Sequence, residues 1–306
     1  MGKIAILGAT GHIGKALTYR LSSKTGFEVF LFARSFDRLQ KFVSEIKGKN
    51  KFNVHPIGEF GRHEYDVVIN CVGFGNPSVA KDAGTEIFRV TEEFDNLVLG
   101  YLRANKETLY VNPSSGAVYG KSFYVPVDKN TKTMIDVNNM GSDDYYSIAK
   151  INSESKHRSL PNLNIVDLRI FSFFSRFIEL DSGFLVSEII KNIREGSVLK
   201  TSSEDMVRDY VSPDDLLELI VRCSKRKSIN DFFDVYSRAP VTKFDLLNYF
   251  KNNYGLKYKI KENANVESPT GPKYAYYSTD RKAEGLGYVP KFSSMDCIKR
   301  EIKGIL

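Results

Sequence analysis

The sequence has few of the residues that build metal centres and disulfide frameworks. Three cysteines and four histidines are scattered over 306 residues, and no two cysteines stand in a C-x-x-C pair. An even number of cysteines at short spacings would be expected for a disulfide framework, and paired Cys or His motifs for zinc. The sequence therefore predicts neither a disulfide framework nor a metal site.

Long apolar runs are missing as well. No stretch reaches the roughly 18 uncharged apolar residues that a membrane helix needs, and the N-terminal MGKIAILGATGHIG has no signal-peptide cleavage site. We therefore expect no membrane segment and a cytoplasmic location. Lysine and arginine exceed aspartate and glutamate by 44 to 37, but they are spread along the chain without a basic block. We therefore expect no nucleic-acid partner, because such partners favour clustered charge.

Strand-like and helix-like segments alternate over the first half of the sequence. Short apolar runs predict strands, and apolar residues at helical spacing predict the segments between them to be helices. This alternation is typical of right-handed βαβ units, so we expect a Rossmann-type α/β fold with a doubly wound parallel sheet. The predicted strands are 3–7, 28–33, 52–57, 66–72, 108–112 and 163–170, and the predicted helices include 38–46, 87–105, 184–194, 213–223, 243–253 and 294–306.

The connection from Glu59 to Asp66 is too short for a full helix, so one crossover is expected to be abbreviated. After residue 170 the pattern becomes less regular, which suggests a smaller C-terminal lobe that binds substrate. We assign residues 1–171 to a dinucleotide-binding domain, with a returning segment near 207–236. Residues 172–206 and 237–306 are assigned to the smaller lobe.

A glycine-rich loop lies between the first predicted strand and the first helix. Gly8, Gly11 and Gly14 form a G-x-x-G-x-x-G pattern there. Glycines at this place allow unusual backbone dihedrals and let a pyrophosphate approach the chain, while the helix N-terminus offers free N–H groups and partial positive charge. The loop therefore predicts a dinucleotide site. Its spacing resembles the extended class of short-chain dehydrogenases/reductases, which includes nucleotide-sugar epimerases, dehydratases and ketoreductases.

The end of the second strand indicates which dinucleotide is bound. NAD-dependent enzymes place an acid there for the ribose 2′-hydroxyl, whereas an arginine accommodates a 2′-phosphate. Ala33 stands in the place of the acid, Arg34 follows at once, and Arg38 lies one helical turn beyond. Because a guanidinium pairs well with a phosphate, we expect NADP, with NAD as the alternative.

Tyr146 and Lys150 form a Y-x-x-x-K motif like that of the same family. Residues four apart share one helix face, so the ammonium lies beside the phenol and favours its ionised form. The segment from Ser114 to Gly120 resembles the S-S-x-x-V-Y-G turn of nucleotide-sugar epimerases. By this resemblance Ser115 is the catalytic hydroxyl, so Ser115, Tyr146 and Lys150 are the predicted catalytic residues.

Further matches to the family supply the remaining binding residues. The family places an acid near the adenine at Glu59, and lines the cofactor with the end of the strand over 66–72. The segments 168–172 and 207–215 resemble family motifs, with Ser172 in place of an asparagine; 286–290 resembles the family's end signature. The implied cofactor-binding residues are Gly8, Thr10, Gly11, His12, Ile13, Gly14, Arg34, Ser35, Arg38, Glu59, Cys71, Val72, Gly73, Tyr146, Lys150 and Phe171. The implied substrate-binding residues are Ser115, Ser172, Arg208 and Lys273.

Two departures from the family bear on the substrate and the reaction. Residues 267–272 carry no arginine of the R-P-G-D type, and Lys273 is the nearest cation. Dehydratases of the family usually carry an Asp-Glu pair after the catalytic serine or threonine, but here those positions are Gly116 and Ala117. The sequence therefore favours an NADP-dependent reduction of a keto group on a nucleotide-activated sugar.

Two alternatives stay open at this point. One is a nucleotide-sugar epimerase that retains its cofactor. The other is a non-catalytic relative that senses the cofactor or binds RNA, although the intact Ser115, Tyr146 and Lys150 argue against it. The resemblance also implies a homodimer through the helices over 87–105 and 146–157, with Phe94, Leu97, Val98 and Tyr101 as candidate contacts. Burial against the chain's own sheet explains these four residues equally well. Surface-polysaccharide biosynthesis is the pathway that the family suggests.

Overall fold

The computed structural model describes residues 2–48, 50–75, 77–120, 123–261 and 273–306. This part of the chain is built on a seven-stranded sheet in which each neighbouring pair is parallel. The strand order is β11-β6-β5-β4-β1-β2-β3. The strands are β1 (Gly2–Leu7), β2 (Phe27–Ala33), β3 (Phe52–Pro56), β4 (Val67–Asn70), β5 (Leu109–Ser115), β6 (Ile165–Ile170) and β11 (Asn230–Val235). The predicted Rossmann-type sheet is thus confirmed.

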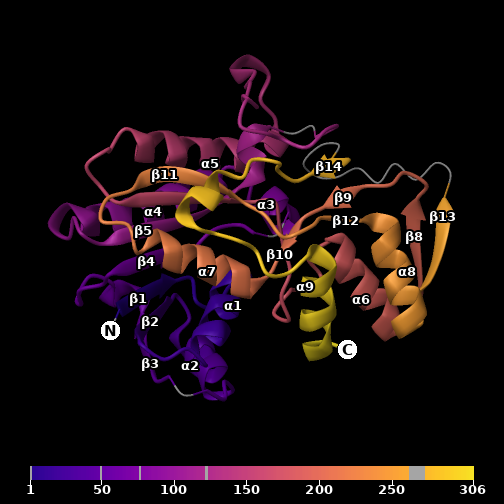
Figure 1. Cartoon of the computed structure of the whole chain (residues 1–306), viewed down its shortest axis with the longest axis horizontal. Helices are drawn as coiled ribbons and strands as arrows, with labels where there is room; N and C mark the ends of the chain where they lie inside the picture. Colours follow the sequence, from indigo (N-terminus) through magenta and orange to yellow (C-terminus); the bar gives the residue numbers. More distant parts are fainter. Residues whose placement is uncertain (1, 49, 76, 121–122, 262–272) are drawn as a thin grey trace.

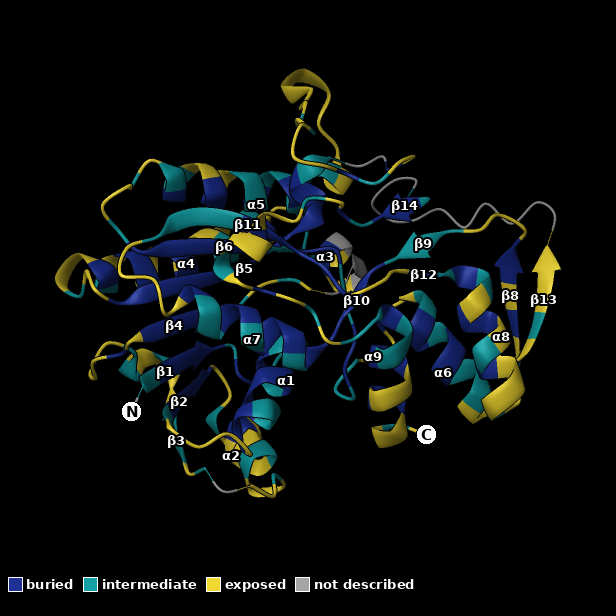
Figure 2. Cartoon of the chain, viewed as in Figure 1, coloured by how far each residue is buried: buried dark blue, intermediate teal, exposed yellow. Residues whose placement is uncertain are grey.

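Helices cover both faces of this sheet (Figure 1). Alternate residues of a strand point to opposite faces, so Ile4 and Ile6 join one apolar core while Ala5 and Leu7 join another. The first core is closed by α1 (His12–Leu21), α2 (Phe36–Ser44) and α7 (Pro213–Cys223). The second is closed by α4 (Glu86–Ala104), against which α5 (Ser142–Arg158) packs. Figure 2 shows the strands as the buried layer between these helices.

The strand order reverses at β1, which lies between β2 and β4. In open parallel sheets, ligands bind at the carboxyl ends of the strands at such a reversal. The fold therefore places the glycine loop, which follows β1, at the position where a dinucleotide is expected.

The abbreviated crossover between β3 and β4 is confirmed. A single short 3-10 turn, η1 (Ile57–Glu59), stands there, and aromatic side chains cover the sheet in place of a helix. Phe60 stacks on Tyr65 at a ring separation of 5.6 Å, and the Tyr101 hydroxyl accepts the backbone N–H of Tyr65 at 2.9 Å. These rings extend the second core to the edge of the sheet.

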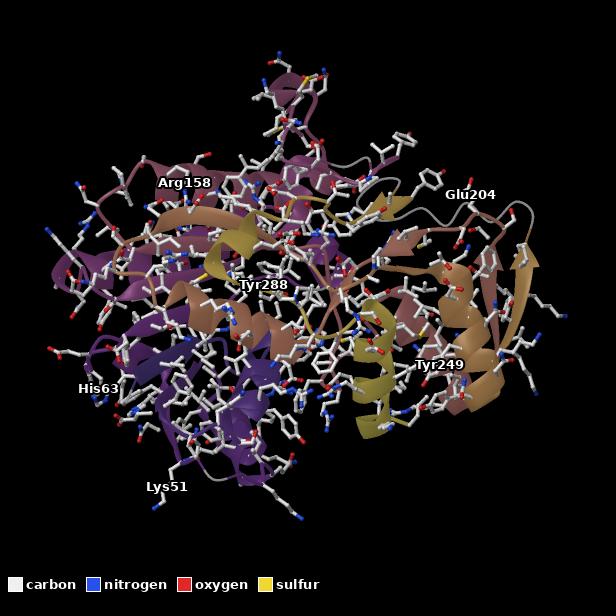
Figure 3. The ribbon with its side chains drawn as sticks, viewed as in Figure 1. Lys51, His63, Arg158, Glu204, Tyr249 and Tyr288 are labelled. Atoms are coloured by element: carbon white, nitrogen blue, oxygen red, sulfur yellow. The ribbon has the colours of Figure 1, made fainter. Side chains whose placement is uncertain are left out.

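The remaining elements form a second region with its own buried core, at the opposite end of the molecule from His63 (Figure 3). Its larger elements are α6 (Leu185–Glu195), β8 (Val198–Ser202), α8 (Lys243–Tyr254), β13 (Lys257–Lys261) and α9 (Ser294–Glu301). Short strands join it to the sheet: β7 (Ser172–Phe173), β9 (Val207–Arg208), β10 (Tyr210–Val211), β12 (Val241–Thr242) and β14 (Ala275–Tyr276). The minor helices are α3 (Pro77–Ala83), η2 (Gly116–Tyr119), η3 (Val137–Asn139), η4 (Lys282–Leu286) and η5 (Ile302–Gly304).

Three of the four residues suggested for a dimer interface serve the chain's own packing. Phe94 and Val98 are buried, and the Tyr101 hydroxyl is bonded to Tyr65. Leu97 stays 39% exposed on the outer face of α4. The homodimer therefore remains a prediction. Within the described parts of the chain, each helix is too short or too polar to cross a bilayer.

Candidate active site

The glycine loop is shaped by two close backbone approaches. Gly8 has φ +72°, and a Cβ there would lie 2.8 Å from the carbonyl carbon and oxygen of Cys71. A Cβ on Gly14 would clash with the carbonyl oxygen of Gly8. Both positions therefore require glycine, the first because a left-handed conformation and a neighbouring strand end coincide there. Ala9 N donates to Phe32 O at 3.1 Å, so the loop is held against the end of β2.

The loop opens α1 in the manner that a pyrophosphate site requires. Gly11 is the N-cap and supplies no side-chain cap, so the N–H groups of the first turn, which contains Ile13, remain without an internal partner. His12, which directly follows the N-cap Gly11, has a buried Nε2 without a hydrogen-bond partner among the described residues. Burial lowers the pKa of His12 to about 4, so the ring is neutral. The bare N–H groups and the glycine cradle fit a dinucleotide phosphate.

Two cations stand at the end of β2, beside this loop. Leu7 pairs with Phe32 across β1 and β2, so the residues that follow each strand lie side by side. Arg34, Ser35 and Arg38 are all exposed. Within the described part of the chain, neither guanidinium has an ion-pair partner. Their charge is therefore available to an anion at this strand end.

The end of β4 forms the next wall of the proposed cofactor site. Cys71 N donates to Leu7 O at 2.9 Å, and Val72 N donates to Asn70 Oδ1 at 3.2 Å. Gly73 follows, with an exposed backbone. Burial raises the pKa of the Cys71 thiol to about 12, so the side chain is a neutral wall and no nucleophile.

Glu59, expected near the adenine, already has partners of its own. Its carboxylate lies 3.0 Å from His55 Nδ1 and accepts from Arg62 Nη1 at 3.0 Å. The hydrogen bond from His55 is the main reason that the pKa of Glu59 is lowered. A contact between Glu59 and the adenine remains a prediction.

Ser115 is the last residue of β5 and is only 7% exposed. Its Oγ accepts the backbone N–H of Ala117 at 3.1 Å, as the N-cap of η2. Its own proton is thus directed elsewhere, and the Tyr276 hydroxyl lies 3.3 Å away. The neighbouring Ser114 instead donates to Glu154 at 2.6 Å, which is a structural bond.

Tyr146 and Lys150 share one face of α5, next to the turn that carries Ser115. Lys150 Nζ lies 5.9 Å from the centre of the Tyr146 ring. The same ammonium donates to Pro113 O at 3.0 Å, which anchors it to β5 two residues before Ser115. The predicted catalytic residues thus converge at the carboxyl end of β5.

Tyr276 was not predicted, yet it occupies the centre of this region. It is a buried residue of β14, and its ring packs edge-on against Phe123 at 4.7 Å and Phe171 at 5.2 Å. Burial raises the pKa of its phenol, and the nearby Tyr146 acts in the same direction. Its 161-residue separation from Ser115 left no local pattern that could have identified it.

Two of the predicted substrate-binding cations lie over the Tyr276 ring. Lys273 Nζ is 4.4 Å and the Arg208 guanidinium 5.9 Å from the ring centre. Arg208 donates to two carbonyls, those of Val207 and Lys273, so its charge is not neutralised by these contacts. Burial, and then the charge of Arg208, lower the pKa of Lys273 to about 8. Arg208 and Lys273 thus place two partly desolvated cations beside Tyr276.

For Ser172 and Thr10, the structure gives the position in the fold, and their contacts with ligands stay predictions. Ser172, in β7, pairs with Tyr210 of β10 and is half-buried. Thr10 lies in the glycine loop itself. The segment 267–272, in which the R-P-G-D arginine is missing, lies outside the described residues.

Comparison with protein families places this site in a known group. Residues 4–235 match the model of the NAD dependent epimerase/dehydratase family. The chain belongs to this family. The predicted family is thereby confirmed, and with it the expectation of an enzyme. No curated protein matches the chain in sequence.

Solved structures of similar shape extend over almost the whole chain. A UDP-glucose-4-epimerase from Stenotrophomonas maltophila, with bound NAD and formylated UDP-arabinopyranose, has a TM-score of 0.81 at 17% identity and covers 99% of this chain and 98% of its own. A UDP-glucuronic acid 4-epimerase from Bacillus cereus has a TM-score of 0.78 at 18% identity, with the same coverage. A dTDP-glucose 4,6-dehydratase from Bacillus anthracis scores 0.76 at 13% identity and covers 99% and 96%. At these identities the likeness establishes the fold of this family member.

Proposed function

We propose that the protein is an NADP-dependent oxidoreductase that reduces a keto group of a nucleotide-activated sugar at Ser115, Tyr146 and Lys150. The observation that carries the proposal is the convergence of these residues beside a glycine cradle at the strand reversal. The similar solved structures support the substrate class, since their bound ligands include UDP-linked sugars.

When bound, a nicotinamide dinucleotide supplies the hydride for the reduction. Ser115, whose Oγ already accepts Ala117 N–H, directs its proton to the reacting oxygen. Tyr146 transfers its proton to the same oxygen, and Lys150 stabilises the phenolate that remains. Pro113 O holds the ammonium in place. Together, these groups place positive charge where negative charge develops during the reduction.

The preference for NADP is supported by the end of β2. A carboxylate at position 33 would repel a 2′-phosphate, but Ala33 is apolar and buried. Arg34 and Arg38 are exposed, and no described acid pairs with them. Because NADPH is the cellular reductant, this arrangement favours net reduction over a cofactor that cycles within the site.

The catalytic turn argues against a dehydratase. A Cβ at Gly116 would overlap the Phe171 ring, so packing forbids a side chain where the dehydratases of the family carry an acid. The next residue, Ala117, is buried and has no acid. Elimination needs an additional acid and base, which this turn does not provide.

Epimerisation is the second candidate. It uses the same Ser115, Tyr146 and Lys150 to oxidise a hydroxyl and then to reduce the ketone from its other face. The 4-epimerases among the similar solved structures, with NAD bound, favour it. The substrate's diphosphate is proposed to lie against Arg208 and Lys273 in either reaction.

The test is product analysis after incubation with a panel of keto and hydroxy nucleotide sugars. Loss of one NADPH per sugar, with a hydroxyl formed at the former ketone in the NMR spectrum, supports the reductase. A changed configuration of the sugar with no net loss of NADPH supports the epimerase instead. Absence of any sugar product contradicts both.

A further inference from the structure

A chain of largely buried hydrogen bonds runs from the end of β5 to the last residue of η2. It begins at Ser114, which donates to Glu154 at 2.6 Å. Arg169 donates to the same carboxylate through Nη2 at 2.6 Å, and through Nη1 to the Tyr119 hydroxyl at 2.8 Å. Tyr119 in turn donates to Asp234 at 3.0 Å. The turn that begins after Ser115 is thus anchored at its far end by an aspartate of β11.

Asp234 also reaches the segment that carries the unpredicted tyrosine of the site. Ser278 donates to it at 2.5 Å and accepts the backbone N–H of Asp280 at 3.0 Å. Ser278 lies two residues beyond Tyr276, and it forms an isolated bridge with Val127. One buried carboxylate, 2% exposed, therefore connects the catalytic turn to the strand that brings Tyr276 and Lys273 to the site.

We propose that Asp234 is a positioning residue that locks the turn bearing Ser115 to the segment bearing Tyr276 and Lys273. This inference rests on the proposed function, because Ser115 is the reacting hydroxyl in that function. Asp234 touches neither Ser115 nor Tyr276. It acts through Tyr119 on one side and Ser278 on the other.

Two hydroxyl groups donate to Asp234: Tyr119 to Oδ1 and Ser278 to Oδ2. Both carboxylate oxygens therefore have to act as acceptors. Tyr119 accepts from Arg169 and Ser278 accepts from Asp280, so the one proton of each hydroxyl is directed to the carboxylate. An ionised aspartate accepts both, whereas an asparagine turns an N–H₂ group toward one of these donors. The position therefore selects a carboxylate over an isosteric amide.

The titratable groups that act on Asp234 come from three other segments of the chain. Arg169 lies on β6, the Tyr119 phenol on η2, and Asp280 after β14. Burial raises the pKa of Asp234 to about 6, against the lowering effects of Ser278, Arg169 and Tyr119. Asp234 is thus ionised at neutral pH and becomes protonated just below it.

The test compares Asp234→Asn with Asp215→Asn. Asp215 is a matched control, because it is equally buried and accepts backbone N–H groups and a serine hydroxyl, but at α7. For Asp234→Asn we expect kcat to fall at least about tenfold, with the KM for NADPH unchanged. The fall of wild-type kcat below pH about 6 should disappear in this variant. Asp215→Asn should lower the Tm without these changes.

Tyr119→Phe is the second variant, used also if Asp234→Asn fails to fold. It removes the same link, so the double variant should lose no more activity than the more affected single variant. Equal kcat in Asp234→Asn and wild type, or an equal kcat loss in Asp215→Asn, overturns the proposal.

Amide hydrogen exchange separates this proposal from the proposed function, because it needs no substrate. In Asp234→Asn, amide exchange should become faster in both segments, 115–120 and 273–280. In Asp215→Asn, exchange in both segments should stay at the wild-type rate. Unchanged exchange in both segments of Asp234→Asn refutes the lock. If exchange is faster in Asp234→Asn but the wild-type protein reduces no sugar, the positioning role of Asp234 is established and the proposed function is wrong.

Discussion

The proposed preference for NADP rests on the guanidinium of Arg34, the first residue after β2. Ala9 N bonds to Phe32 O, so the glycine loop and this strand end are in contact. The guanidinium is exposed and unpaired among the described residues, and Arg38 stands one turn further along α2. Arg34→Ala removes one charge-assisted contact to a 2′-phosphate and leaves the strand and loop intact.

The expected rise in the KM for NADPH follows from the solvent exposure of the Arg34 guanidinium. A hydrogen bond to a charged group contributes roughly 1.5–3 kcal/mol, but solvent screening reduces an exposed ion pair to about 1 kcal/mol or less. An intermediate value of about 1–1.5 kcal/mol corresponds to roughly a five- to tenfold higher KM for NADPH. The double variant Arg34→Ala/Arg38→Ala should raise the KM for NADPH by about 30- to 100-fold if the two contributions add.

The assay is steady-state reduction with NADPH and with NADH, at low and at high salt. The KM for NADH should stay unchanged, because NADH has no 2′-phosphate. Arg103→Ala serves as the control for net charge, because Arg103 is exposed in the last turn of α4, which packs on the face of the sheet opposite to α2. An unchanged KM for NADPH in the double variant, or an equal rise for both cofactors, would refute the reasoning.

Three further predictions address the turn, the substrate site and the core. Gly116→Asp should lower the free energy of unfolding by about 1–3 kcal/mol, because the new side chain overlaps the Phe171 ring. Thermal unfolding measures this loss, and a variant as stable as the wild type contradicts it. Product NMR should show no dehydrated sugar. The KM for the nucleotide sugar should rise above pH about 8 as Lys273 loses its charge, and this rise should be missing in Lys273→Met. Burial disfavours a charged His157, but hydrogen bonds to two aspartates outweigh it and raise its pKa to about 9. Because the folded pKa is raised, the stabilisation from His157 is complete below pH about 6.5 and lost as the pH rises through 9. The stability difference between wild type and His157→Gln in urea should shrink over that range, and a constant difference would contradict the assignment.

The sequence was most informative where function depends on residues close together in the chain. The glycine loop could be predicted because Gly8 and Gly14 meet steric demands within one strand–helix turn. Helix α7 has the predicted bounds, Pro213–Cys223, because a proline at its start and an amphipathic repeat define it locally. The end of β5 was placed too early, at residue 112, because Pro113 interrupts the apolar run although the strand continues to Ser115.

Features that depend on distant segments could not be predicted. Tyr276 meets Ser115 across 161 residues, and Asp234 meets Tyr119 across 115. Neither residue belongs to a local motif, since only the packing of β14 and β11 brings them to the turn.

The central claim is tested most directly by NADPH oxidation in the presence of a keto nucleotide sugar, comparing Tyr146→Phe with Tyr145→Phe. The two residues are neighbours on α5, and Tyr145 packs on Phe88 at 5.5 Å. Each substitution removes one phenolic hydroxyl, so the pair is matched. The account predicts that Tyr146→Phe lowers kcat by at least about a hundredfold, as loss of a general acid does, while Tyr145→Phe stays near the wild-type rate. Equal rates for Tyr146→Phe and wild type would contradict it.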